Sequence, residues 1–125
     1  MCFYRTSDYK KAETDIICYK IMELDYKNML HSPIWNKHIS YRLGSKIKAA
    51  KKLSWFRKRN VRLINTLPQL NGEVVHSFTN NINTDIGTSS PNVVVKCVIP
   101  KGEYYWENTH YEEYASLSMK IIQIL

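Results

Sequence analysis

Residues 93–99, Val-Val-Val-Lys-Cys-Val-Ile, place β-branched side chains at five of seven positions. A short apolar run of this kind that ends at a turn signal is typical of a strand buried on both faces. The turn signal is Pro100-Lys101-Gly102, where proline favours the first central position of a turn. We therefore expect residues 93–99 to form the central strand of a sheet and residues 103–106 to form the next strand.

The sequence on both sides of this strand predicts further strands. They are residues 15–22 (DIICYKIM), 38–43 (HISYRL), 74–79 (VVHSFT) and 117–124, with a shorter extended piece at 61–65. Gly44-Ser45 break the second of these strands, and residues 80–92 predict a polar loop.

Residues 46–59 predict a helix instead, with Ser45 as the residue that caps its start and Asn60 as the left-handed residue after its end. A mainly antiparallel sheet with one basic amphipathic helix is an α+β fold. A chain of 125 residues fits one domain, so we expect residues 1–125 to form a single α+β domain.

The positive charge of the chain is concentrated in one segment. Residues 26–72 contain eleven Lys and Arg and no Asp or Glu, whereas the rest of the chain carries seven Lys and Arg against eleven acidic residues. The formal net charge of +7 therefore comes entirely from this basic segment. A concentrated positive field attracts polyanions, which favours a binding protein with an anionic partner.

On a helical wheel, residues 46–59 separate an apolar face from a cationic one, and Trp55 lies in the middle of the cationic face. A tryptophan there could stack on an unpaired base or anchor a protein interface. The predicted partner-binding residues are Lys46, Lys48, Lys51, Lys52, Trp55, Arg57, Lys58, Arg59 and Arg62. Three other interpretations stay open: a face that is only solvated, a face covered by the chain's own glutamates, or a membrane-surface helix.

The sequence offers little chemistry for an enzyme. The four histidines have no metal-ligand spacing, and there is no glycine-rich phosphate loop, so we expect no metal and no cofactor. One enzyme hypothesis survives, an ADP-ribosyltransferase-like arrangement of Arg5, Ser77 and Glu113, or of His76 with Glu112. The cysteines at 2, 18 and 97 are odd in number, which favours free thiols in a reducing cytosol.

Residues 103–114 (EYYWENTHYEEY) combine five aromatic residues with four glutamates. The pattern predicts a β-hairpin with Tyr104 and Trp106 on one face. Alternatively, the stretch is an aromatic edge that binds protein. Its glutamates would repel nucleic acid, so a polyanion is expected to contact the opposite side of the molecule, near residues 46–62.

Several separated fragments resemble one protein family. They are IICYKIM (16–22), SYRLG (40–44), VVHSF (74–78), VVVKCVIPKGEYYW (93–106) and EYASLSMKIIQI (113–124). In this order they resemble small uncharacterised proteins of Bacteroidetes-group bacteria and of their phages and mobile elements. The family has no assigned activity to carry over. The resemblance implies a phage or mobile-element setting, in which small basic proteins often act on host defence or on nucleic acid.

From the charge pattern and this resemblance, we expect a non-enzymatic binding protein of a phage or mobile element. It would act in the bacterial cytoplasm as an anti-CRISPR-like inhibitor of a host nucleic-acid-guided nuclease complex. The alternatives are a plain RNA- or DNA-binding accessory protein and the ADP-ribosyltransferase-like enzyme. The chain has no run of about 18 apolar residues and no basic-then-apolar start, so neither a membrane span nor a secretory signal is predicted.

Overall fold

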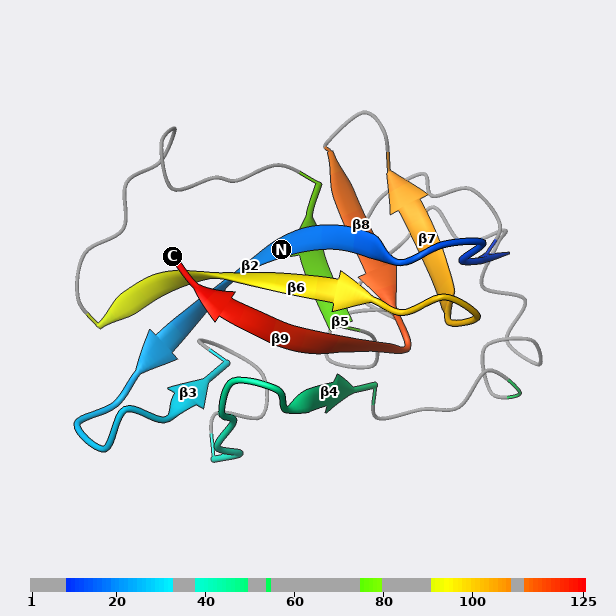
Figure 1. Ribbon diagram of the computed structural model, residues 1–125. Helices are drawn as coiled ribbons and strands as arrows, with labels where there is room; N and C mark the ends of the chain where they lie inside the picture. The colour runs from blue at the N-terminus through cyan, green and yellow to red at the C-terminus, as the bar shows by residue number, and fades with distance from the viewer. Residues whose placement is uncertain (1–8, 33–37, 50–53, 55–74, 80–90, 109–111) are drawn as a thin grey trace.

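The computed structural model describes residues 9–32, 38–49, 54, 75–79, 91–108 and 112–125, and these form an antiparallel β-sheet (Figure 1). The described residues form nine strands: β1 (Lys10–Lys11), β2 (Ile16–Leu24), β3 (Leu30–His31), β4 (Lys46–Lys48), β5 (Val75–Phe78), β6 (Asn92–Ile99), β7 (Tyr104–Asn108), β8 (Glu113–Ser116) and β9 (Ser118–Ile124). Their order across the sheet is β1-β7-β8-β5-β2-β6-β9-β4, and β3 pairs with β2.

The predicted central strand is confirmed. Strand β6 pairs with β2 over eight residue pairs on one side and with β9 on the other. Its register with β9 shifts between Lys96 and Cys97, where one step along β6 matches two steps along β9. Ile122 is the extra residue, so Ile122 and Gln123 are both exposed, as at a β-bulge.

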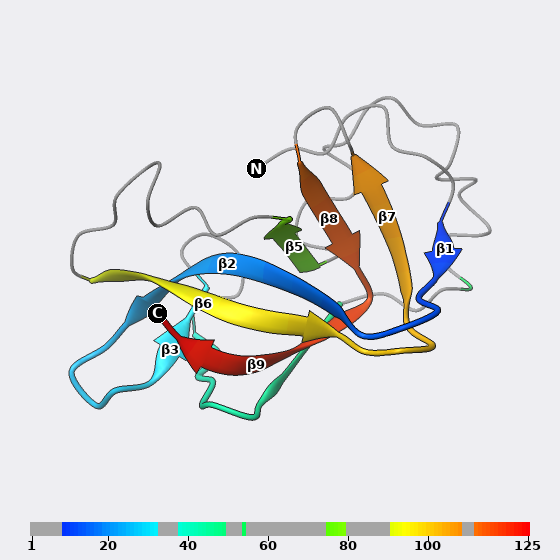
Figure 2. The ribbon, with the colours of Figure 1, turned by 45° about the horizontal axis from the view of Figure 1, so that its top comes forward.

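The sheet bends so that its two halves enclose a core. In Figures 1 and 2, β2, β6 and β9 run side by side, while β5, β7 and β8 cross them at a steep angle. Strands β8 and β9 are separated only by Leu117, so one stretch of chain passes from one half to the other. Strands β2 and β5 share a single residue pair, Tyr19 with Phe78, so the halves diverge there. This is the geometry of orthogonal sheet packing, in which bent strands make the corners.

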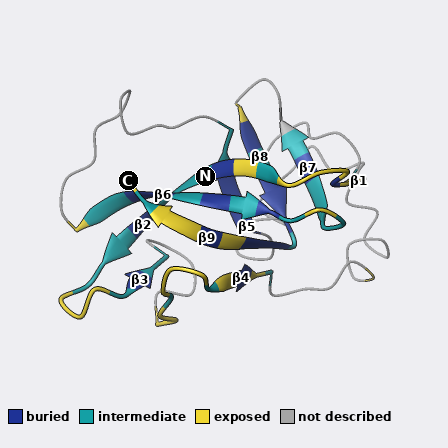
Figure 3. Cartoon of the chain, in the orientation of Figure 1, coloured by how far each residue is buried: buried dark blue, intermediate teal, exposed yellow. Residues whose placement is uncertain are grey.

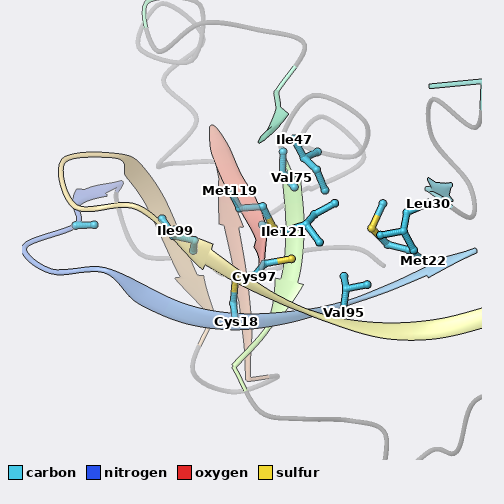
Figure 4. Packing of buried hydrophobic residues seen from close by; sticks show 11 residues of the cluster. Cys18, Met22, Leu30, Ile47, Val75, Val95, Cys97, Ile99, Met119 and Ile121 are labelled. Atoms are coloured by element: carbon cyan, nitrogen blue, oxygen red, sulfur yellow. The ribbon is translucent and has the colours of Figure 1, made fainter. Parts of the chain in front are cut away.

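The core lies between the two halves and draws on nearly every strand. Figure 4 shows side chains from β2, β4, β5, β6 and β9 converging on it. Alternation along the strands explains this placement, because every second residue faces the same side of a sheet. The fully buried aliphatic and sulfur-containing residues of this core are Cys18, Met22, Val95, Cys97, Ile99, Met119 and Ile121.

The expectation of an α+β fold with one basic helix is wrong for the described residues, which contain no helix among their elements. Residues 46–48, the predicted start of that helix, form β4 and pair with β9. The alternation Lys46-Ile47-Lys48 exposes both lysines and buries Ile47. Burial of the Ile47 side chain in the core is more favourable than its position on the predicted helix. Apart from Ser54, residues 50–59 lie outside the described part of the chain, as do residues 61–65.

Some of the remaining expectations are confirmed and others are wrong. The strands at 15–22, 74–79 and 117–124 are confirmed as β2, β5 and β9, and the hairpin over 103–114 is confirmed as β7 paired with β8. The strand at 38–43 is wrong, because within it only Tyr41 pairs, in an isolated bridge with Leu30. The turn after β6 is present, but Pro100 is its first residue. The Glu103 amide donates to the Pro100 carbonyl at 3.0 Å, and Gly102 has φ 91°, as a type II turn requires.

Candidate anion-binding surface

The described part of the basic segment contributes an edge strand with two exposed lysines. Strand β4 ends the strand order, with β9 as its partner, and Lys46 and Lys48 project from the face opposite to buried Ile47. Figure 3 shows this alternation of exposed and buried residues along β4, next to an exposed stretch of β9. On β9, Lys120 is exposed and lies between the buried residues Met119 and Ile121. We call Lys46, Lys48 and Lys120 the basic edge.

Two members of the basic edge face each other. Lys46 on β4 is the direct register partner of Lys120 on β9, and both side chains are exposed. Like charges directly opposite each other on a sheet destabilise it. Neither lysine forms an ion pair with any described carboxylate; the ion pair found among described residues joins Asp25 and His31. The register therefore places two exposed lysines opposite each other, and neither has an ion-pair partner among the described residues.

A protective role explains part of this pattern. Lysines on an edge strand discourage pairing with the edge of another sheet. That role accounts for Lys46 and Lys48 on β4, but not for Lys120, because β9 is an interior strand with partners on both sides. The cross-strand pair thus needs a reason beyond edge protection.

One carboxylate lies near the basic edge and is already engaged. Ser118, the register partner of Lys48, donates its hydroxyl to the Glu103 carboxylate. The other oxygen of that carboxylate accepts the Tyr104 amide at 2.9 Å. Glu103 therefore lies close to Lys48 but forms no ion pair with it, and its negative charge is held by hydrogen bonds from other groups.

The structure places only two of the nine predicted binding residues. Lys46 and Lys48 lie side by side on β4, whereas Lys51, Lys52, Trp55, Arg57, Lys58, Arg59 and Arg62 lie outside the described residues. Sequence reasoning missed Lys120. It is the only charged residue of the predicted strand 117–124, but its position opposite Lys46 depends on a register that the sequence does not display.

A partly buried lysine lies on the core-facing side of β2. Lys20 on β2 shares the core-facing side with Cys18 and Met22, and its Nζ donates to the carbonyl of His76 at 3.0 Å. That carbonyl is accessible because β5 diverges from β2. Burial lowers the pKa of Lys20, and the neighbouring cysteines offset this only in part. Burial also raises the pKa of the Cys18 and Cys97 thiols, to about 11 and about 12. Both thiols are free and enclosed, as the sequence predicted.

Two residues of the ADP-ribosyltransferase-like hypothesis, Ser77 and Glu113, are not brought together. Ser77 on β5 is the register partner of Tyr114 on β8, so Ser77 and Tyr114 share a face. Glu113 precedes Tyr114 and lies on the opposite face of β8. A serine and a carboxylate on opposite faces of paired strands cannot act on one substrate atom. Burial raises the pKa of Glu113, and Arg5 lies outside the described residues.

The second version of that hypothesis pairs His76 with Glu112. His76 is buried on β5, whereas Glu112 is exposed in the turn before β8, where it has φ 53°. Within the described ranges, no group of three or more His, Cys, Asp or Glu side chains is placed to hold a metal ion. No described helix has the length and apolar character needed to cross a membrane.

Compared with protein-family models, with curated proteins and with solved structures, the chain has no match. The resemblance to the Bacteroidetes-group family therefore stays a prediction.

Proposed function

We propose that this protein is a non-enzymatic binding protein that engages a polyanionic partner through the basic edge. The observation that carries the proposal is the register pair Lys46–Lys120, two exposed cations that face each other without a carboxylate partner among the described residues. An anion that binds between them removes their repulsion and gains attraction from both. The repulsion between the two lysines destabilises the free protein, and its relief on binding adds to the affinity for the anion.

Nucleic acid is the polyanion that this arrangement favours. Phosphates repeat at regular spacing along a strand, and each contact with a lysine releases counterions. The basic edge leads directly into the remainder of an acid-free segment with eleven positive charges over residues 26–72. A long cationic segment of this kind suits a repeating anion better than a single acidic patch on a protein.

The specific form that we propose is an anti-CRISPR-like inhibitor of a host nucleic-acid-guided nuclease complex, acting in the bacterial cytoplasm. Such a complex offers exposed nucleic acid and a protein surface together, which suits a basic segment that also contains Trp55. The family resemblance supports the phage or mobile-element setting. A plain nucleic-acid-binding accessory protein shares the first step, binding, and differs only in the absence of inhibition.

The experiment measures binding of a fluorescent single-stranded oligonucleotide at several salt concentrations. If the protein neutralises Z phosphates, the logarithm of the affinity falls against the logarithm of salt with a slope of about −0.7Z. The double variant Lys46→Gln/Lys120→Gln should weaken binding. It should also reduce Z, the number of neutralised phosphates obtained from the slope, by about one to two. The control Lys27→Gln/Arg42→Gln removes the same charge from exposed turns.

Binding that does not depend on salt, or equal losses in the two double variants, would exclude the basic edge as the contact. The inhibitor form is tested by plasmid interference in cells that carry an RNA-guided nuclease. Inhibition is supported if the wild-type protein abolishes plasmid interference and the Lys46→Gln/Lys120→Gln variant does not. Salt-dependent binding without any effect on interference favours the accessory protein.

A further inference from the structure

A second surface with ligand-binding features lies at the opposite end of the strand order from the basic edge. There β1, the start of β2 and the turn after β6 come together, as Figure 2 shows at one end of the sheet. They border an open cleft of about 1240 Å³ at the mouth of the space between the two halves of the sheet. Clefts at the mouths of barrel-like sheets are common ligand sites, and their volumes are usually about 300–1,000 Å³.

The cleft combines aromatic rings with cations. Tyr105 on β7 and Tyr114 on β8 line it, with ring centroids 5.8 Å apart and an angle of 77° between the ring planes. Three exposed lysines surround the rings: Lys10, Lys11 and Lys101. None of them forms an ion pair with a residue in the described ranges. Among the described residues that line the cleft, Glu13 is the only acidic one, against three lysines.

Hydrogen bonds fix the walls of the cleft. The Ala12 amide donates to the Glu103 carbonyl at 2.8 Å, and the Gly102 amide donates to the Ala12 carbonyl at 2.8 Å. The Lys101 amide donates to the Asp15 carboxylate at 2.8 Å. The segment between β1 and β2 is therefore joined to the turn after β6 at three points. A ligand would meet a surface that is already ordered, which lowers the entropic cost of binding.

Buried hydroxyl groups lie next to the two rings. Ser116 is the register partner of Tyr105, and Ser77 is the register partner of Tyr114. Both serines are fully buried; the Ser116 hydroxyl has no hydrogen-bond partner among the described residues, whereas the Ser77 side chain is hydrogen-bonded to the Cys18 thiol. The strand face that carries the tyrosines thus also carries one buried hydroxyl without a described partner, that of Ser116. Buried polar atoms without partners are rare in folded proteins and call for an explanation.

Two glutamates of residues 103–114, Glu103 and Glu113, are held or turned so that they do not oppose an anion here. The Glu103 carboxylate is held by Ser118 and by the Tyr104 amide. Glu113 lies on the face of β8 opposite to Tyr114, and its burial favours the uncharged form. Glu107, by contrast, is the register partner of Tyr114 and shares its strand face, so it adds a negative charge beside that ring.

We propose that the cleft between β1, β7 and β8 binds nucleotides, with the base against Tyr105 and Tyr114 and the phosphate at Lys10, Lys11 and Lys101. Bases stack on tyrosine rings whatever their sequence, and lysines contact phosphate as point charges. The volume exceeds that of a typical single-ligand pocket, so the cleft has room for more than one nucleotide unit.

Isothermal titration with four probes tests this proposal and identifies the source of the nucleotide. The probes are AMP, ribose 5-phosphate, adenosine and a four-residue single-stranded oligonucleotide. We expect AMP to bind more tightly than either ribose 5-phosphate or adenosine, because only AMP has both the base and the phosphate. A higher affinity for AMP than for the oligonucleotide identifies a free nucleotide as the ligand, and the reverse identifies a strand. Equal affinity for AMP and ribose 5-phosphate, or no binding of AMP and the oligonucleotide, overturns the proposal.

Variants connect the binding to the cleft. Tyr114→Leu keeps an apolar side chain of similar burial but removes the ring, and it should weaken binding about tenfold. Lys10→Gln and Lys101→Gln should weaken AMP binding and leave adenosine binding unchanged. Each variant is checked for an unchanged melting temperature. If Tyr114→Leu melts early, Lys10→Gln carries the test, because Lys10 is exposed and removes no packing. Unchanged AMP binding in Lys10→Gln and Lys101→Gln would place the ligand elsewhere.

The two surfaces are tested separately. The variant Lys46→Gln/Lys120→Gln should leave AMP binding intact, since these residues are not part of the cleft lining. If that variant loses strand binding while AMP binding persists, both proposals stand. If AMP binding disappears with the basic-edge variant and survives the cleft variants, the cleft proposal fails and the basic-edge proposal remains.

Discussion

Cys18 on β2 and Cys97 on β6 lie directly opposite each other in the antiparallel register, and neither side chain is exposed. Burial raises the pKa of both thiols, so their reactive thiolate forms are scarce at neutral pH. In a Cys2→Ser background, we expect a disulfide-forming reagent such as DTNB to modify the native protein very slowly. Both thiols should react at once in guanidinium chloride. Rapid modification of the native protein at the rate of a free thiol would contradict the burial of this pair.

The Lys20 ammonium should make stability depend on pH. Burial lowers its pKa in the folded state below 10.5, so the unfolded state binds the proton more strongly. Its contribution to the free energy of unfolding is present above pH 10.5 and is lost as the pH falls through the folded pKa. We expect the unfolding free energy of the wild type to increase relative to that of Lys20→Met as the pH rises toward 10.5. Chemical denaturation at several pH values measures it, and a constant difference would contradict the prediction.

Reversing one charge of the basic edge should increase the stability of the protein and weaken its binding to an anion. In Lys46→Glu, the new carboxylate faces Lys120 across the β4–β9 ladder. A cross-strand pair of opposite charges contributes about 0.2–1 kcal/mol, so we expect the variant to be more stable than the wild type. Its affinity for a single-stranded oligonucleotide should fall. Lys27→Glu carries the same charge change in a turn and should not gain stability. A loss of stability in Lys46→Glu would argue against the register.

Asp25 stabilises the turn between β2 and β3 through its carboxylate. The carboxylate accepts the amides of Lys27 at 2.8 Å and Met29 at 2.9 Å, and it lies 2.7 Å from Nε2 of His31. These contacts, the Met29 amide first, lower the pKa of Asp25. Its stabilising effect is therefore present above pH 3.8 and is lost as the pH falls through the folded pKa.

Asp25→Ala should destabilise the protein at neutral pH and reduce the loss of stability on acidification. Asp25→Asn keeps an oxygen acceptor and should lie between the wild type and Asp25→Ala. Urea denaturation from neutral to acidic pH measures both effects. Equal acid dependence in all three proteins would show that this carboxylate does not contribute.

Gly102 is needed for its backbone conformation. Its φ of 91° belongs to a region that L-residues rarely adopt, yet a Cβ added there would meet no atom within 4 Å. Gly102→Ala should therefore cost about 1 kcal/mol through the backbone alone. Gly102→Asn should cost less, because asparagine tolerates this conformation better than alanine. Thermal denaturation compares the two, and an equal loss would point to a steric cause.

The strands that contribute most of the core were predictable, because a run of apolar residues directly indicates a buried strand. Residues 93–99 and 15–22 are long enough and sufficiently β-branched for local sequence to indicate the strand. Strand β4 was not predictable in this way. It has three residues, it leads into a run that favours a helix, and its conformation depends on pairing with β9, about seventy positions further along the chain.

The candidate sites show the same limit. Local sequence indicated the charge of Lys46 and Lys48 but not the position of Lys120, because register is a long-range property. The cleft was missed entirely. Its residues come from three distant stretches of chain, and the acidic character of residues 103–114 suggested the opposite preference for Tyr105 and Tyr114. Only the register shows that Glu113 lies on the other face of β8 from Tyr114, whereas Glu107 shares the face of both rings.

The passage of the chain from β8 through Leu117 into β9 has a consequence for avidity. Tyr114 of the cleft and Lys120 of the basic edge lie on this one stretch, six residues apart, which spans about 20 Å at most. Their separation is therefore set by a short, hydrogen-bonded length of backbone instead of a flexible linker. A nucleic-acid strand that reaches both surfaces would make its second contact at a high effective concentration. Two individually weak contacts would then act as one strong one, with a minimum strand length that binding measurements can determine.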